Sequence, residues 1–174
     1  GPANPALPII KVKAVTTRTN PIMQTCIGPS EEHVSMAGIP TEASILDMVE
    51  RAMPGRVQNV YAHSSGGGKF IAVIQFKKTV PSDEGRQRQA ALLAFSAFPE
   101  LKQVILVDED VDIFDTNDVL WAMTTRMQAD VDIVTIPGVR CHPLDPSNDP
   151  ACSWSIRDHG IACKTIYDAT VPFN

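Results

Sequence analysis

Five acidic side chains follow one strongly apolar stretch of the sequence, residues 104–107. These acids are Asp108, Glu109, Asp110, Asp112 and Asp115. Carboxylates at the C-terminal end of a buried strand can bind a hard cation such as Mg²⁺ or Mn²⁺, as a DxD-like site does for a nucleotide sugar. The same acids can instead cap turns, precede a helix N-terminus and pair with Arg126 or Arg140. We favour the structural interpretation, because acids of this kind are common outside metal sites.

A glycine-rich loop at residues 64–68 precedes Lys69, the second group that could do chemistry. The loop lacks the GxxxxGK[ST] spacing and leads into an expected strand instead of a helix, so phosphate binding is weakly supported. Glycine lets a substrate or another backbone approach closely, and Lys69 would add a positive charge there. The alternative is an exposed lysine at a strand edge.

A third candidate is His142, which lies beside Arg140 in the proline-punctuated loop GVRCHPLDP. Rigid loops often carry binding groups, and an imidazole can transfer a proton or bind a phenol near neutral pH, although a loop histidine can equally be a packing residue. The other histidines lack the spacing of a zinc site: His33, His63 and His159. A serine hydrolase around Ser65 is also poorly supported, since the sequence has no GxSxG motif.

Composition limits the class of partner. The 174 residues carry a net charge of −5 with dispersed basic residues, which argues against nucleic-acid binding. The longest apolar runs are strand-sized and no signal peptide is evident, so we expect a cytoplasmic protein that does not enter a membrane. The cysteines show no CxxC spacing and are expected to be free thiols: Cys26, Cys141, Cys152 and Cys163. Gly1 and Pro2 resemble the remnant of a cleaved affinity tag.

The first half of the chain is expected to contain three strands and one helix. The β-branched residues 9–17 predict a strand, and the apolar spacing after Thr41 predicts a helix that ends near Pro54. Residues 57–63 and 69–76 predict two further strands. These two strands could form a hairpin across the glycine-rich loop.

The second half is expected to contain two helices and two strands. Ser82 and Thr116 are the predicted caps of the helices, and residues 103–107 predict a strand that is buried on both faces. Residues 131–136 predict a strand that completes a parallel strand-helix-strand unit, and the chain beyond is expected to be rich in loops. This alternation indicates an α/β fold, a three-layer α/β/α sandwich with a mixed, largely parallel sheet.

Three segments together resemble the UbiD decarboxylases. Residues 18–33 (RTNPIMQTCIGPSEEH) resemble the stretch that leads into that family's last domain. Residues 104–132 resemble its C-terminal core signature, a DEDVD-like turn and a D-V-x-W-A helix, and KTIYDAT at 164–170 resembles its late lysine and D-A-T segment. The resemblance implies that residues 3–174 are one C-terminal α/β domain of a larger decarboxylase. It also implies that the acids of the DEDVD turn are a fold signature.

On this resemblance, the full enzyme performs a non-oxidative, reversible decarboxylation of an unsaturated or aromatic acid with prenylated FMN. The family's flavin-binding split-barrel domain, the ligands of its Mn²⁺ (or Mg²⁺) and K⁺, and its catalytic arginine and acids lie upstream of this chain's first residue. We therefore expect no cofactor-binding or metal-binding residue in this fragment, which should be inactive alone. The resemblance further implies a homo-oligomer and a contact with the protein's own N-terminal flavin-binding domain.

The motifs SGGGKF and VRCHPL look like those of the gallate and protocatechuate decarboxylases, which implies that Lys69 and His142 act on the ring hydroxyls of a hydroxybenzoate. The same resemblance implies three substrate-binding residues: His33, Arg140 and Leu144. A buried phenol oxygen needs a polar partner, so such groups would select hydroxylated rings. Two alternatives remain: a metal-dependent nucleotide-sugar transferase that uses Asp108 and Asp110, and a module whose main role is oligomerisation.

Overall fold

The computed structural model describes residues 8–28, 30–142, 145–148 and 161–173. Helices, short 3-10 turns (η) and strands alternate along these ranges. Their order is α1 (Glu31–Ala52), β1 (Val57–Ala62), η1 (Ser64–Gly66), β2 (Ile71–Phe76), η2 (Pro81–Asp83), α2 (Arg86–Ala97), β3 (Gln103–Val107), α3 (Thr116–Arg126), α4 (Ala129–Asp132), β4 (Ile133–Arg140), η3 (Pro146–Asn148) and β5 (Ile161–Asp168).

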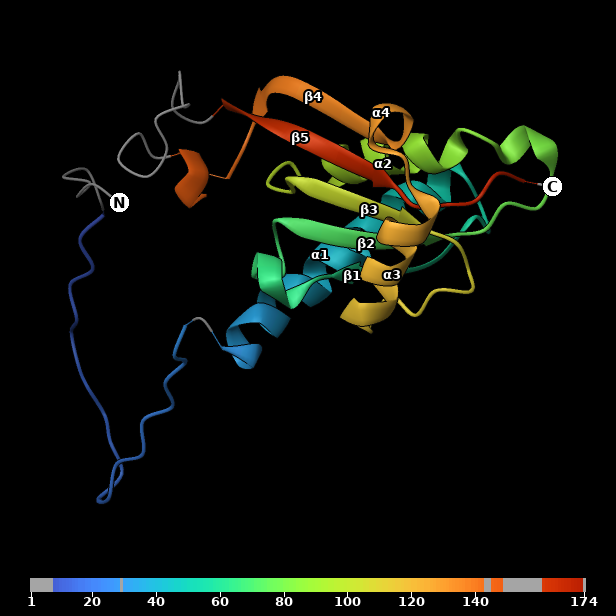
Figure 1. Cartoon of the computed structure of the whole chain (residues 1–174). Helices are drawn as coiled ribbons and strands as arrows, with labels where there is room; N and C mark the ends of the chain where they lie inside the picture. Colours follow the sequence, from blue (N-terminus) through green and yellow to red (C-terminus); the bar gives the residue numbers. More distant parts are fainter. Residues whose placement is uncertain (1–7, 29, 143–144, 149–160, 174) are drawn as a thin grey trace.

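The five strands form one mixed sheet in the order β1-β2-β3-β5-β4 (Figure 1). The three central strands, β2, β3 and β5, run parallel to one another, and Val104 of β3 lies between Ala72 of β2 and Ile166 of β5. The two outermost strands, β1 and β4, run antiparallel to their neighbours. The mixed sheet and the hairpin of β1 and β2 confirm the prediction, and two of the four strand pairings are parallel.

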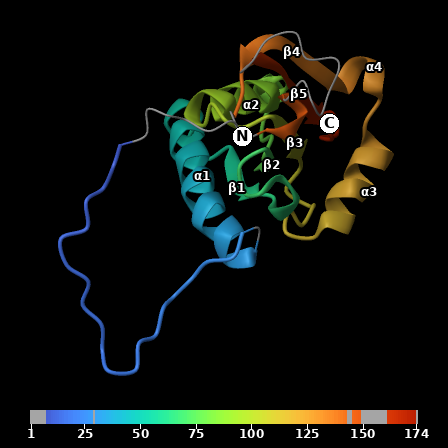
Figure 2. The ribbon, with the colours of Figure 1, turned by 90° about the vertical axis from the view of Figure 1, so that its left-hand side faces the viewer.

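Helices cover both faces of the sheet, which gives the predicted three layers (Figure 2). Side chains of a strand alternate between its faces. On β3, Val104 and Leu106 therefore join the core under α1 and α2, whereas Ile105 and Val107 join the core under α3. All four of these side chains are at most 6% exposed, so the strand is buried on both faces as predicted.

The predicted strand at residues 9–17 is not formed. Residues 8–28 extend away from the folded body (Figure 1), and each of them is exposed. β-branched residues favour a strand only where a neighbouring strand supplies hydrogen bonds and packing. None of the described strands pairs with this segment, which we call the N-terminal arm (residues 8–28).

The first helix begins earlier than predicted. α1 starts at Glu31, after Ser30, whose hydroxyl group accepts a hydrogen bond from the backbone N–H of His33 at 3.4 Å. Pro40 therefore lies inside the helix, where a proline removes one backbone hydrogen bond. Because Met36 and Pro40 are exposed, water can bind the Met36 carbonyl that Pro40 leaves without a donor, and the helix continues through Thr41, the predicted start.

Two predicted helix caps also lie at the wrong residue. Ser82 belongs to the 3-10 turn η2, and α2 starts only after Gly85, which has a φ of 86°. The cap of α3 is Asp115 instead of Thr116, since the Asp115 carboxylate accepts a hydrogen bond from Asn117 N at 2.9 Å. An aspartate is as good a cap as a threonine, and the sequence places the two side by side.

The predicted parallel strand-helix-strand unit is wrong. β4 does not pair with β3, because β5 lies between them and pairs with β4 in the antiparallel direction. β5 falls in a region that was expected to be rich in loops, and its alternation of exposed and buried residues marks a strand. Within the described residues, no helix is long and apolar enough to cross a membrane.

Candidate active site

Three loops meet where the parallel strands begin. We call this row of strand ends one edge of the sheet, and the row where the parallel strands finish the opposite edge. Lys69 and Phe70 precede β2, Glu100 precedes β3, and His142 follows β4. Because β4 is antiparallel to β5, the end of β4 lies beside the beginnings of the central strands. The topology therefore brings together side chains that are far apart in the sequence. We call Lys69, Glu100 and His142 the Glu100 cluster.

The carboxylate of Glu100 links the two predicted catalytic residues. Its Oε2 lies 3.0 Å from Nε2 of His142 and 3.9 Å from Nζ of Lys69. The His142 ring also meets the Phe70 ring edge-on, with 5.3 Å between the ring centroids. His142 is only 6% exposed, whereas the side chains of Lys69 and Glu100 are 37% and 38% exposed. The cluster thus combines an ammonium, an imidazole and a carboxylate at a partly open edge, where they can bind or exchange a phenol proton.

The glycine-rich loop allows the close approach that the sequence predicted. Gly68 has a φ of 69°, and a Cβ atom there would lie 2.7 Å from Val34 O and 2.8 Å from Gly38 N. The backbone of α1 occupies this space, so Gly68 fits the loop against the helix. This contact fixes the backbone from which Lys69 extends.

His63 stabilises the other end of the same loop. Its Nδ1 lies 2.7 Å from Ser65 Oγ and accepts the Ser65 N–H at 3.1 Å, while its Nε2 lies 2.8 Å from Thr116 Oγ1. Burial lowers the pKa of His63, which favours the neutral ring, whose Nδ1 accepts from Ser65 while Nε2 donates to Thr116 Oγ1. Ser65 and His63 resemble a nucleophile and its base, but the third position carries Thr116 instead of an acid. We interpret His63 as the cap of η1.

The other predicted site residues are more scattered. His33 is exposed on the first turn of α1, which packs against η1, and no hydrogen bond or ion pair joins it to Lys69. Arg140 is exposed and lines a shallow pocket of about 350 Å³ between α2 and the β4/β5 pair, together with Lys164. Leu144 lies outside the described residues, as do His159 and Cys152.

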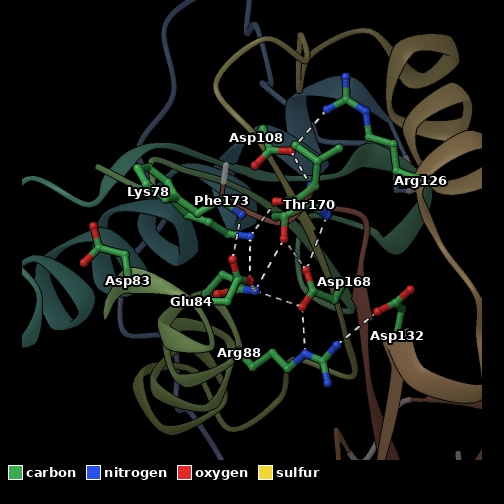
Figure 3. Close-up of polar contacts among 12 residues, drawn as sticks. Lys78, Asp83, Glu84, Arg88, Asp108, Arg126, Asp132, Asp168, Thr170 and Phe173 are labelled. Carbon is green, nitrogen blue, oxygen red and sulfur yellow. Dashed lines mark hydrogen bonds and ion pairs between the residues drawn. The ribbon is translucent and has the colours of Figure 1, made fainter. Parts of the chain in front are cut away.

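The acidic residues gather at the opposite edge of the sheet, where Arg126 contacts Asp108 (Figure 3) and also Asp110. Its guanidinium group lies 3.2 Å from Asp108 and makes two contacts with Asp110, at 3.0 and 2.6 Å. The hydrogen bonds from Arg126 lower the pKa of Asp110, whereas burial raises the pKa of Asp108. The predicted pairing of acids in this cluster with Arg126 is therefore confirmed for Asp108 and Asp110.

The same edge also holds the end of the chain (Figure 3). Val171 N donates to Asp108 at 2.8 Å, and Val171 O accepts from Lys78 Nζ at 2.7 Å. Glu84 pairs with Lys78 at 2.9 Å and accepts from Phe173 N at 2.9 Å. Among the described residues, no three His, Cys, Asp or Glu side chains are placed to hold one metal ion. The arrangement therefore gives no support to the transferase alternative.

The family model for the C-terminal domain of 3-octaprenyl-4-hydroxybenzoate carboxy-lyase, UbiD, matches residues 34–169. The chain belongs to the UbiD family. The match spans α1 to the end of β5 and so includes the whole sheet and the Glu100 cluster.

Individual relatives agree with this membership. The chain is 64% identical over 175 residues to the gallate decarboxylase of Lactiplantibacillus plantarum, covering 100% of this chain and 36% of the relative. It superposes on apo 3,4-dihydroxybenzoic acid decarboxylase of Klebsiella pneumoniae with a TM-score of 0.84 at 65% identity, covering 89% of this chain and 32% of that one. The UbiD-class enzyme HmfF of Pelotomaculum thermopropionicum, solved in complex with FMN, gives a TM-score of 0.78 at 35% identity, covering 88% and 32%.

These relatives are much longer than the chain, which spans about a third of their length. The family match and the sequence identities establish the UbiD architecture of this domain and its homology to aromatic-acid decarboxylases. Glu100 is the member of the cluster that the sequence did not reveal. The only signal was an acid in the turn before a buried strand. The five acids after that strand were the stronger candidates for a site.

Proposed function

We propose that the polypeptide to which this domain belongs decarboxylates a hydroxybenzoate of the gallate or protocatechuate type, in a non-oxidative and reversible reaction. The domain supplies one wall of the substrate cleft and part of an oligomer interface. Lys69 and His142 contact the ring hydroxyls in this proposal, with His33, Arg140 and Leu144 as further substrate-binding residues.

The observation that carries the proposal is the meeting of Lys69 and His142 at one edge of the sheet. An ammonium group that can donate and an imidazole that can donate or accept are thereby available to adjacent hydroxyls of one ring. A phenol that is buried without a partner costs about 1–3 kcal/mol, so paired polar groups favour hydroxylated rings over bare ones. The relatives named for gallate and 3,4-dihydroxybenzoic acid support the same substrate class.

We place the cofactor in a flavin-binding domain of the longer polypeptide, because the chain spans about a third of its relatives and a UbiD-class relative was solved in complex with FMN. Prenylated FMN bound there, together with Mn²⁺ or Mg²⁺ and K⁺, would supply the chemistry by which the substrate loses its carboxylate as CO₂. We also place the enzyme in the reducing cytoplasm as a homo-oligomer. Free thiols at the described cysteines, Cys26, Cys141 and Cys163, support the reducing location.

The test joins this domain to its flavin-binding domain, supplies prenylated FMN and measures CO₂ release from gallate, protocatechuate and 4-hydroxybenzoate. We expect turnover of gallate or protocatechuate. The variant Lys69→Met should lower kcat/KM by about 10²-fold or more. Lys77→Met is the matched control, because Lys77 pairs with Glu109 at the opposite edge. Absence of turnover with all three acids would refute the substrate class.

A further inference from the structure

Glu100 lies between the two proposed catalytic residues and contacts both of them. The comparisons with relatives assign it no role. It lies in the turn between α2 and β3, where Leu101 N donates to Phe98 O at 3.0 Å and Lys102 N donates to Phe70 O at 2.9 Å. These bonds fix the backbone on both sides of Glu100. Its carboxylate is therefore held at the mouth of the loops that carry Lys69 and His142.

We infer that Glu100 is a positioning residue for the reaction. It orients the His142 ring, keeps a proton on Nε2 and holds the Lys69 ammonium at the same edge. This inference rests on the proposed function, since it assumes that Lys69 and His142 meet the substrate. It adds a third member to the substrate-recognition site.

The contact with His142 is the stronger half of the arrangement. An imidazole N–H that donates to a carboxylate forms a charge-assisted hydrogen bond, which is shorter and stronger than a neutral one. Nε2 of His142 and Oε2 of Glu100 are 3.0 Å apart, a distance at which an ion pair or an N–H···O contact can form, and the ring is almost wholly buried. The partner of one ring nitrogen decides which nitrogen carries the proton. Phe70 packs edge-on against the same ring and limits its rotation.

The contact with Lys69 is weaker. The two charged atoms are 3.9 Å apart, and both side chains are more than one third exposed. An ion pair of this kind contributes little to stability. The effect of Glu100 on Lys69 is therefore to orient its side chain. The carboxylate keeps the ammonium near His142 until a substrate oxygen can take over the contact.

The experiment compares Glu100→Ala with the conservative variant Glu100→Gln, whose amide oxygen can still accept from Nε2. Glu109→Ala is the matched control, because Glu109 pairs with Lys77 at 2.6 Å at the opposite edge. Nitrogen-15 NMR of the 174-residue chain reports which ring nitrogen of His142 is protonated. A His142→Asn variant identifies its signals. In parallel, kcat/KM for protocatechuate is measured in the full enzyme.

We expect the wild type, Glu100→Gln and Glu109→Ala to carry the His142 proton on Nε2, and Glu100→Ala to lose this preference. Removing a residue that orients a functional histidine typically lowers activity about 10- to 100-fold. Glu100→Ala should therefore lower kcat/KM by about that factor, whereas Glu100→Gln should keep most of the wild-type kcat/KM. An unchanged protonation pattern in Glu100→Ala would overturn the inference, even if kcat/KM fell. Unchanged kcat/KM would overturn it as well.

The two proposals fail in different ways. A wild-type full enzyme without decarboxylase activity refutes the proposed function, whereas the NMR result still decides whether Glu100 sets the state of His142. If the wild-type chain itself lacks a proton on Nε2, the positioning role is refuted whatever the activity.

Discussion

At the scale of single residues, Asp83 shows how a buried carboxylate fixes the connection between β2 and α2. It is fully buried, and its Oδ2 accepts from the backbone N–H groups of Thr79 and Val80 at 2.8 and 3.2 Å. Its Oδ1 pairs with Arg56 at 3.0 Å. The backbone hydrogen bond from Thr79 is the largest cause that lowers the pKa of Asp83 from 3.8 to about 2, and it outweighs the opposing effect of burial.

This pKa predicts an acid-sensitive fold. Because the folded pKa lies below the unfolded one, ionised Asp83 stabilises the fold above about pH 4, and this contribution is lost as the pH falls toward about 2. Asp83→Asn should lower the thermal midpoint at pH 7 by several degrees and flatten its decline below pH 4. Midpoints measured from pH 7 to pH 2 check this.

The matched control is Asp47→Asn, because Asp47 pairs with Arg51 in an exposed i,i+4 contact. It should change the midpoint little at any pH, since such surface pairs contribute little. Equal thermal midpoints of the two variants at every pH would show that the contacts of Asp83 stabilise the fold no more than an exposed ion pair does.

At the scale of the elements, the glycine-rich loop depends on one close approach to α1. Gly67 and Gly68 have similar positive φ values, 64° and 69°, but only Gly68 faces the backbone of α1. An alanine at either position meets the strain of a left-handed conformation, about 1–2 kcal/mol. At Gly68 the added Cβ would also displace the helix from the loop that carries Lys69.

We therefore predict that Gly68→Ala lowers the free energy of unfolding by about 1–3 kcal/mol more than Gly67→Ala does. Denaturant unfolding of both variants measures the difference directly. Because the φ values nearly match, the comparison separates the contact with α1 from backbone strain. Equal losses in the two variants would mean that the helix adjusts freely around the loop.

The elements also show what the sequence could and could not predict. Local signals sufficed for the hairpin of β1 and β2, but they left the partner of the acids open between Arg126, which the structure shows, and Arg140. The direction of β4 depends on β5, a strand that enters the sheet from later in the chain. No local pattern carries that information. For the same reason Lys69 and His142 were predicted one by one, while their meeting at Glu100 was not.

At the scale of the whole molecule, the two edges of the sheet differ in character. At one edge, Asp108, Glu84 and Lys78 bind the last residues of the chain, so their charges serve the fold (Figure 3). At the other edge, the Glu100 cluster stays partly open. The fold thus separates the acidic residues that follow β3 from the groups that we propose for substrate recognition.

The N-terminal arm lies apart from the sheet and its helices (Figure 2), and it carries exposed apolar side chains. Its exposed apolar side chains include Ile9, Ile10 and Met23, which are 95%, 87% and 83% exposed. Surfaces of this kind mark contacts with other protein parts.

The most direct test of the central claim is the kcat/KM of His142→Ala for protocatechuate in the full enzyme with prenylated FMN. If His142 meets a ring hydroxyl, removing the imidazole should lower kcat/KM by about 10²-fold or more. Unchanged kinetics would contradict the account and would leave this domain an assembly module without a part in the substrate cleft.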